Sequence, residues 1–382
     1  MVRKPITNYG RVGNTEQEST AKQEINDEQI RKVRKIAETA YLNKFEGWSQ
    51  KLRNTLLFYA VENNLLDVVE YCVFSRFFLN IIDKQGNTPL IIATKQNNLK
   101  IVDILLMYDA DPRARESIKG FTALMFACKN GSIDLVKTLL NYGSNINEVS
   151  YNGCTPLLIA TKQDNTEIAE YLMKSGADTN LVSPKNGFSA LIWAAYNGNE
   201  YLAKVLVDHK ANIDQVSYNG RTPLLIAAEQ NNTKVAEYLV KSGADTNLVN
   251  PKGWISALMW AVHNGNEYLT KVLVDHEANV NAISYEGCLP LNLAQELGHE
   301  GVKSILKQAG AISSEVYISE EINEYICKKS KANYLEKIKW NNMAKIIEKQ
   351  WELRKTQTDI EFSTKSSTRS RIWSFIRSLF GY

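Results

Sequence analysis

The stretch GRTPLLIAAEQNNTKVAEYLVKSGADTNLVN, residues 220–250, contains the signals for two short helices and two turns. The Thr222 hydroxyl can cap the first helix, and Pro223 suits its first position because no N–H is needed there. The two asparagines in the middle tolerate positive φ, which separates this helix from a second one. Gly243 then ends the second helix in a left-handed conformation. The stretch therefore predicts a helix-turn-helix unit with a polar link to the next unit.

The motif Thr-Pro-Leu-x-x-Ala of this unit recurs in variant forms eight times, each 33 or 34 residues after the last. The copies begin at Thr55, Thr88, Thr122, Thr155, Ser189, Thr222, Ser256 and Leu289. A fixed period of this size is typical of a stacked array, in which each unit buries its apolar face only against its neighbours. The sequence therefore predicts an all-α solenoid of about eight helix-turn-helix repeats with β-hairpin-like loops, plus flanking helices.

The unit resembles the ankyrin repeat. Gly-x-Thr-Pro-Leu stands at Gly86–Leu90, Gly153–Leu157 and Gly220–Leu224, Gly-Ala-Asp stands at Gly176–Asp178 and Gly243–Asp245, and Gly298-His299-Glu300 matches the family's turn between helices. The resemblance covers roughly residues 51–316. It implies a module for protein–protein interaction, whose partner contacts lie mostly on the loop tips and on the exposed faces of the first helices, along a concave groove.

Two features depart from the family pattern. The family usually has a His two residues after the Pro, where it bonds the loops of neighbouring repeats. This chain has apolar residues there, so we expect that bond to be absent and any compensating contact to be apolar. They are Ile91, Met125, Leu158, Ile192, Leu225 and Met259. In addition, Asp109, Lys210 and Glu277 replace the capping glycine. A Cβ in a left-handed cap costs about 1 kcal/mol, which predicts local strain or a different turn.

The array also has a longer period. Residues 152–218 and 219–285 match at 47 of 67 positions, which indicates growth by copying pairs of repeats. Alternate repeats have an aromatic residue at the core-facing Leu position of the first helix, so we expect Phe126, Trp193 and Trp260 to have a structural role.

The loop tips share a tyrosine that recurs in every second repeat, at Tyr151, Tyr218 and Tyr285. Tyrosine offers a large contact area at a low entropy cost and is enriched at binding surfaces. Common descent or packing within the turn explains the same recurrence, so both interpretations stay open.

The exposed positions of the first helices form a second candidate surface, in the groove that the family resemblance implies. They include Lys95, Lys129, Lys162, Tyr196, Glu229 and His263. Their mixed character forms no track of a single charge for a nucleic-acid backbone. We therefore expect a protein or peptide partner and no nucleic acid.

The chain divides into four predicted segments. Residues 1–50 form a disordered segment and a capping helix, and residues 51–316 form the array. Residues 317–362 form a helical C-terminal cap, for which a partner-binding or dimerising helix is the alternative. Residues 363–382 form a basic amphipathic tail.

The tail has the composition of a weak membrane-surface helix. One helical face would gather Ile372, Trp373, Ile376, Leu379 and Phe380, with Arg369, Arg371 and Arg377 available to acidic lipid head groups. A sorting signal and a segment that folds back are the alternatives. This tail supports a second hypothesis of function, a membrane-surface or targeting adaptor.

Charge and cysteine content restrict the class of protein. The net charge of +3 hides a basic C-terminal part, since residues 328–382 have 13 Lys and Arg against 5 Asp and Glu. Such an imbalance suggests an acidic partner, a membrane surface or nucleic acid, or only a solvated face. The five scattered cysteines form no Cys-x-x-Cys pair, which argues against a zinc site and favours a reducing compartment. No secretory signal and no transmembrane run is recognisable.

No catalytic motif stands out, and His209 and His276 are copies of one repeat position. We therefore expect a non-enzymatic, monomeric scaffold without a metal or cofactor. The abundance of Lys, Asn and Ile and the recent duplication make the chain similar to ankyrin proteins of intracellular, host-associated bacteria. Some of those act as secreted effectors, so this resemblance implies the bacterial cytoplasm or, after secretion, the host cytoplasm.

Overall fold

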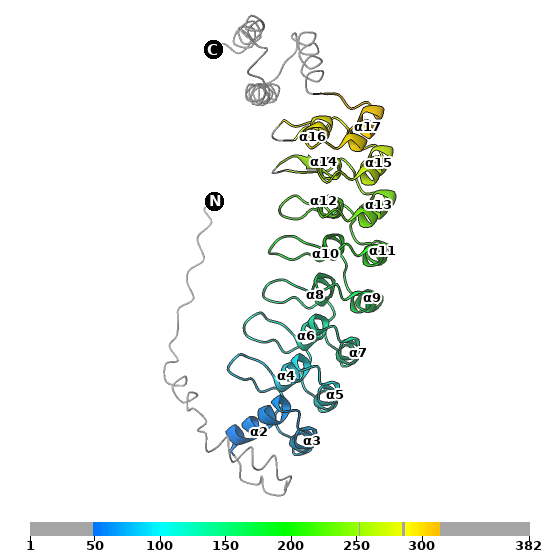
Figure 1. Ribbon diagram of the computed structural model, residues 1–382. Coiled ribbons are helices and arrows are strands. Elements are labelled where there is room, and N and C mark those ends of the chain that lie inside the picture. Colours follow the sequence, from blue (N-terminus) through cyan, green and yellow to red (C-terminus); the bar gives the residue numbers. More distant parts are fainter. Residues whose placement is uncertain (1–48, 252, 285–286, 314–382) are drawn as a thin grey trace, which may run out of the picture. The chain divides into compact units, whose positions relative to one another are not determined.

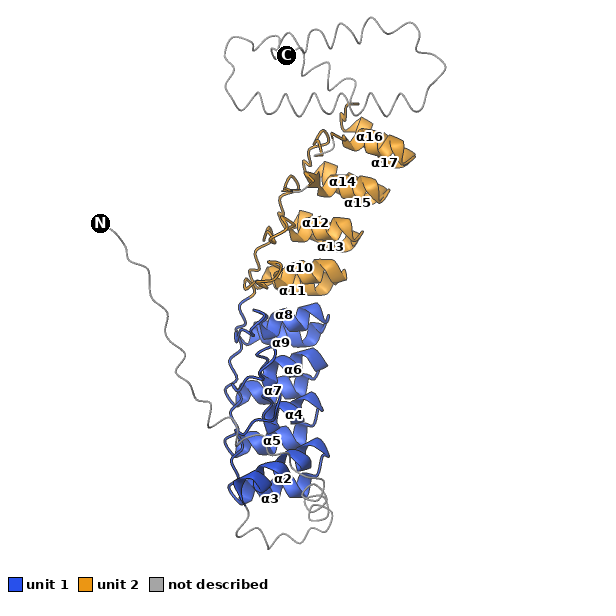
Figure 2. Ribbon diagram, turned by 90° about the vertical axis from the view of Figure 1, so that its left-hand side faces the viewer, with its two compact units in different colours: residues 1–178 blue, residues 179–382 orange. Residues whose placement is uncertain are grey.

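The computed structural model describes residues 49–251, 253–284 and 287–313 of the 382-residue chain. The chain divides into two compact units, residues 1–178 and 179–382 (Figure 2). In each unit the described part is a stack of four antiparallel helix pairs, one pair per layer (Figure 1). The predicted all-α repeat stack is thus confirmed, with sixteen helices among the described residues.

The first unit is built from α2 to α9. The first helices of its layers are α2 (Gln50–Glu62), α4 (Pro89–Lys95), α6 (Ala123–Asn130) and α8 (Pro156–Lys162), and the second helices are α3 (Leu66–Phe74), α5 (Leu99–Met107), α7 (Ile133–Asn141) and α9 (Thr166–Lys174). Each first helix packs on its own second helix and on the first helix of the next layer. The core therefore runs along the unit between the two rows of helices.

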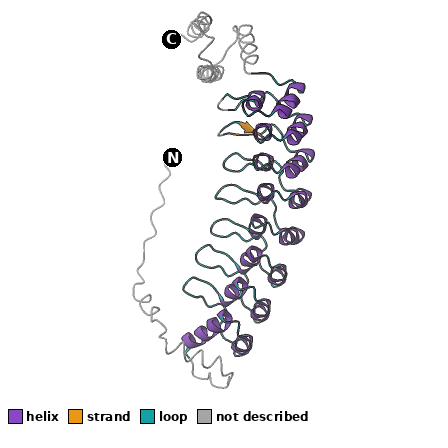
Figure 3. Ribbon diagram, in the orientation of Figure 1, coloured by secondary structure: helices purple, strands orange, loops and turns teal. Residues whose placement is uncertain are grey.

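The second unit repeats this arrangement. Its first helices are α10 (Ala190–Asn197), α12 (Pro223–Glu229), α14 (Ala257–His263) and α16 (Pro290–Glu296), and its second helices are α11 (Glu200–Asp208), α13 (Thr233–Lys241), α15 (Glu267–Asp275) and α17 (Glu300–Gln308). One loop forms a two-residue antiparallel ladder, β1 (Val249–Asn250) with β2 (Ile255–Ser256), in which Val249 pairs with Ser256 (Figure 3).

The repeated Thr or Ser caps the first helix in six layers, because its hydroxyl accepts the backbone N–H three residues later. The caps are Thr88, Thr122, Thr155, Ser189, Thr222 and Ser256. Leu289 stands at the N-cap of α16 but has no hydroxyl, so no side-chain hydrogen bond caps that helix. The first copy of the motif is different: α2 begins at Gln50, so Thr55 lies inside the helix and its hydroxyl donates to the Lys51 carbonyl at 2.8 Å.

The left-handed turns lie where the sequence predicts them. Asn231 has φ 56° and Gly243 has φ 92°. The three non-glycine caps keep the same conformation, since Asp109 has φ 66° and both Lys210 and Glu277 have φ 63°. Of the two predicted outcomes, the structure therefore shows local strain and no different turn. Arg76 is a further case, with φ 53°, that the sequence analysis missed.

The slot that holds His in the family is apolar and buried, and all six of its side chains are at most 3% exposed. Polar bonds link the layers at other positions. Asparagines that begin or precede the second helices donate to the end of the previous first helix, as Asn165 does to the Cys128 carbonyl at 2.8 Å and Asn232 to the Ala195 carbonyl at 2.8 Å. An amide at these turns therefore bonds the preceding layer.

Candidate binding surface

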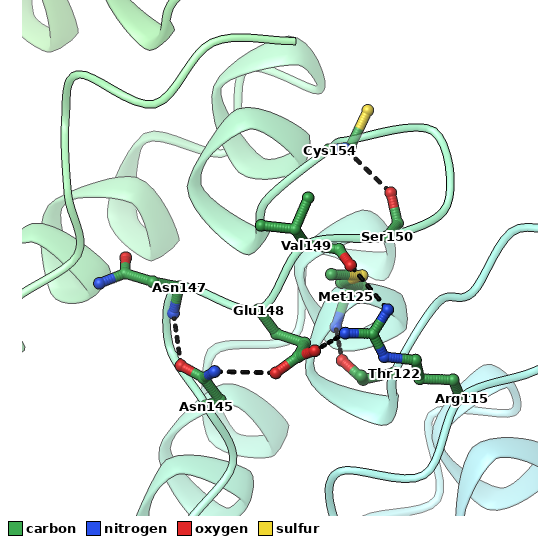
Figure 4. Close-up of polar contacts among 9 residues, drawn as sticks. All are labelled: Arg115, Thr122, Met125, Asn145, Asn147, Glu148, Val149, Ser150 and Cys154. Atoms are coloured by element: carbon green, nitrogen blue, oxygen red, sulfur yellow. Dashed lines mark hydrogen bonds and ion pairs between the residues drawn. The ribbon is translucent and has the colours of Figure 1, made fainter. Parts of the chain in front are cut away.

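The loops between layers are held by bonds within and between repeats. In the loop before α8, the Cys154 N–H donates to Ser150 Oγ at 2.9 Å, and Asn145 Nδ2 donates to Glu148 Oε2 at 2.8 Å (Figure 4). Arg115 of the preceding loop pairs with Glu148 and donates to the Val149 carbonyl at 2.9 Å. These contacts hold the loop before α8 in place.

The tyrosines at the loop tips both pack and remain exposed. The Tyr151 N–H donates to the Lys119 carbonyl at 2.8 Å, and its ring lies against Gly120, where an added Cβ would be 2.6 Å from the ring. Tyr218 lies in the same way on Gly187. Even so, Tyr151 is 62% exposed and Tyr218 is 64% exposed. Packing within the turn therefore explains the glycine contact and leaves most of each ring open, whereas Tyr285 lies outside the described residues.

The predicted helix positions are all at or near the C-terminal ends of first helices, but they belong to two units. Lys129 and Lys162 are exposed in the first unit. In the second unit, Tyr196 is exposed and stacks edge-to-face on Trp193 with 5.8 Å between ring centroids, as His263 does on Trp260. Glu229 is half-buried and pairs with Arg221 at 3.1 Å.

The alternate aromatic residues, for which a structural role is predicted, lie only partly in the core. Phe126, Trp193 and Trp260 are half-buried, whereas Ile226 at the same position of another repeat is fully buried. The larger rings reach past the core toward the loops. Phe121 stacks on Phe126 at 5.5 Å, and Phe188 stacks on Trp193 at 5.1 Å.

Phe121 and Phe188 are surface residues that the sequence analysis missed. Each stands directly before the capping Thr or Ser, a slot that also holds Cys154 and Arg221 in other repeats. That variability was the available signal, because residues that differ between copies of a repeat are not required by its fold.

The titratable groups form no catalytic arrangement among the described residues. His209 Nδ1 lies 2.8 Å from the Val205 carbonyl, and His276 makes the equivalent contact with Val272, so neither ring is oriented by the neighbouring Asp. Burial raises the pKa of the Cys72 thiol to about 12 and also raises the pKa of Cys128, which keeps both thiols protonated. Within the described ranges, no group of three or more His, Cys, Asp and Glu side chains could hold a metal ion.

The amphipathic tail, with Arg369, Trp373 and Phe380, and the predicted helices before residue 49 and after residue 313 lie outside the described residues. None of the helices in the described part is both long and apolar enough to cross a membrane.

Comparison with known proteins identifies the repeats. The family "Ankyrin repeats (3 copies)" matches residues 32–116, 111–183, 176–250 and 243–315. "Ankyrin repeat and SAM domain-containing protein 6" of mouse is 33% identical over 121 residues, which are 30% of this chain and 14% of the mouse protein. "Putative ankyrin repeat protein FPV031" of fowlpox virus (strain NVSL) is 37% identical over 97 residues, 25% of this chain and 28% of the viral protein. This chain thus spans less than a third of these relatives.

A solved structure shows the same architecture. The crystal structure of the ankyrin repeat domain of Bcl-3, described as a unique member of the IkappaB protein family, superimposes with a TM-score of 0.51 and 28% sequence identity. The match covers 57% of this chain and 96% of that chain.

Proposed function

This chain belongs to the ankyrin-repeat family, whose repeats generally mediate protein–protein interaction, and we propose that it binds a protein partner through its loop tips and the exposed ends of its first helices. The observation that carries this proposal is the pair of loop-tip tyrosines. Each is more than half exposed although its backbone and one side of its ring are held by the preceding loop.

A surface that is ordered before binding loses little conformational entropy when a partner docks. Tyr151 and Tyr218 are held by backbone bonds between loops, and Tyr196 is held by its contact with Trp193. Large aromatic side chains fixed in this way are the type that contributes most to binding energy at protein interfaces. Exposed aromatic residues also lie on the second helices, among them Phe74, Tyr201 and Tyr268, and they serve as the comparison in the test.

A role inside a host cell stays part of the proposal. It is supported by the composition and the recent duplication, while the relatives named above come from mouse and fowlpox virus. The membrane-surface or targeting role of the tail likewise stays a prediction from sequence.

The test is an affinity purification from cell extract with two matched triple variants. Tyr151→Ala, Tyr196→Ala and Tyr218→Ala together remove rings from the loop tips and first helices of both units. Tyr142→Ala, Tyr201→Ala and Tyr268→Ala remove three rings that are also exposed, two from α11 and α15 and one from the residue that follows α7. We expect the first variant to recover its specific partners with at least tenfold lower yield and the second to match the unaltered chain. Equal yields from all three proteins, at unchanged melting temperature, would rule out the loop-tip surface.

A further inference from the structure

The first unit separates its charges between its two rows of helices. Its first helices contain five basic residues and one acidic residue, Glu62, whereas its second helices contain six acidic and three basic residues. The second unit lacks this pattern, since its first helices have no Lys or Arg at all. The mixed surface expected from the sequence is therefore basic on one face of the first unit.

Three lysines form a column on this face. Lys95, Lys129 and Lys162 occupy the same repeat position near the C-terminal ends of α4, α6 and α8, which pack side by side, and all three are exposed. We refer to these three residues as the lysine column. Lys119 of the adjoining loop adds a fourth positive charge, and the pKa of Lys95 is lowered by burial, with Lys129 and Lys119 among the causes.

Two phenylalanines lie beneath these charges. The Lys95 ammonium is 4.4 Å from the centroid of the Phe126 ring, and the Lys119 ammonium is 5.8 Å from that of Phe121. The two rings stack on each other and remain half-exposed. The column therefore combines positive charge with an apolar aromatic floor.

The nearby carboxylates are engaged in shaping the loops. Glu116 is only 3% exposed and accepts the backbone N–H groups of Ile118, Lys119 and Phe121. Asp83 accepts the N–H groups of Gln85 and Asn87 at 2.8 Å. Both contribute attraction to Lys95 but accept hydrogen bonds within their own loops, and the Lys95 ammonium donates to Asn87 Oδ1 at 2.5 Å, so no carboxylate forms a direct ion pair with Lys95 among the described residues.

We propose that the lysine column binds an extended acidic segment of a protein partner. This inference rests on the proposed function. It adds that the part of the partner that contacts the first unit is acidic. Packed helices lie about 8–10 Å apart, and an extended polyproline II chain advances about 3.1 Å per residue with three residues per turn, so that every third side chain lies on one face. An Asp or Glu at roughly every third residue would therefore meet one lysine per layer, and apolar residues between them would contact Phe121 and Phe126. A nucleic acid fits less well, because its phosphates are more closely spaced than the lysines and the acidic second helices lie in the same unit.

The test uses the full chain and a fluorescein-labelled peptide, (Glu-Leu-Ser) repeated four times, in an anisotropy titration. The binding variant is Lys95→Gln, Lys129→Gln and Lys162→Gln, and the matched control is Lys100→Gln, Lys137→Gln and Lys174→Gln, three exposed lysines on the second helices of the same unit. Losing three solvent-exposed charge pairs should weaken binding roughly tenfold. The control should stay within about twofold, and affinity should fall as salt rises from 50 to 200 mM.

Several outcomes would overturn the proposal: no saturable binding, equal loss in both variants, equal binding of the (Gln-Leu-Ser) peptide, or a single-stranded oligonucleotide that binds more tightly than the peptide. Circular dichroism of each variant separates a loss of binding from a loss of fold. If the peptide titration fails but the tyrosine variant loses its partners in the purification, only the acidic-peptide assignment is wrong. Failure of the purification with the tyrosine variants would instead count against the proposed function.

Discussion

At the scale of the residue, four residues that follow second helices hold a backbone conformation that favours glycine. Arg76, Asp109, Lys210 and Glu277 have φ between 53° and 66°. The surrounding bonds keep them there: the Lys210 N–H donates to the Val207 carbonyl at 2.9 Å and the Ala211 N–H to the Leu206 carbonyl at 2.9 Å. Gly243 and Ala244 make the same two bonds at 3.0 Å each. The cap geometry is therefore imposed by the helix end, whichever residue occupies it.

Replacing Lys210 and Glu277 by glycine should stabilise the chain by about 0.5–1 kcal/mol at each site. The substitution removes a Cβ that is unfavourable in the left-handed region. Glycine also gives the unfolded chain more conformational entropy, which offsets part of the gain in stability. Urea denaturation followed by circular dichroism measures it. The reverse change, Gly243→Lys, serves as the control and should destabilise by a similar amount. If both changes acted in the same direction, strain at the cap would not be the cause.

At the scale of the element, an asparagine ladder connects the second-helix loops within each unit. In the second unit, Asn180 Oδ1 accepts the Asn212 N–H at 2.8 Å, and Asn247 Oδ1 accepts the Asn279 N–H at 2.7 Å. Asn247 also donates to the Glu277 carbonyl at 3.1 Å. In the first unit, Asn80 and Asn147 accept from the next layer in the same way. Each bond satisfies a backbone group that the irregular loop leaves without a helical partner.

Asn247→Ala should lower the free energy of unfolding by about 1 kcal/mol. It removes two hydrogen bonds between layers, but the groups lie near the surface, so water replaces part of what is lost. The control is Gln230→Ala, an exposed residue at the end of α12, which should change stability by less than about 0.5 kcal/mol. Denaturant titration of both variants measures the free energy of unfolding. Equal changes in the two variants would show that the ladder adds nothing to stability.

At the scale of the whole molecule, each layer packs only on its neighbours, because helix contacts within each unit join adjacent layers. Stability in such an array is close to a sum of terms from each layer and its nearest interfaces. Damage in one layer should therefore remain local. This differs from a globular domain, in which one core residue affects the whole structure.

Leu105→Ala provides the test, since Leu105 is fully buried in α5. The substitution should cost about 2–5 kcal/mol through lost burial and the cavity it leaves. Hydrogen exchange with mass spectrometry should show faster exchange in α3, α4, α5 and α7 and unchanged exchange in α15 and α17. Leu273→Ala in α15, also fully buried, is the matched control and should give the opposite pattern. A uniform rise throughout the chain in both variants would exclude local behaviour.

The sequence by itself determined the helix pairs, their caps and their left-handed turns, because these depend on residues within four or five positions of one another. Thr222 and Gly243 could be placed from local chemistry alone. The tertiary structure decided what neighbouring layers do to each other. Residues about 31–37 positions apart meet only after stacking, as Asn247 meets Asn279 and Asn165 meets Cys128. The same stacking left Phe126 half-exposed beneath Lys95 and aligned the lysine column, because a side chain's final exposure depends on the layer that covers it.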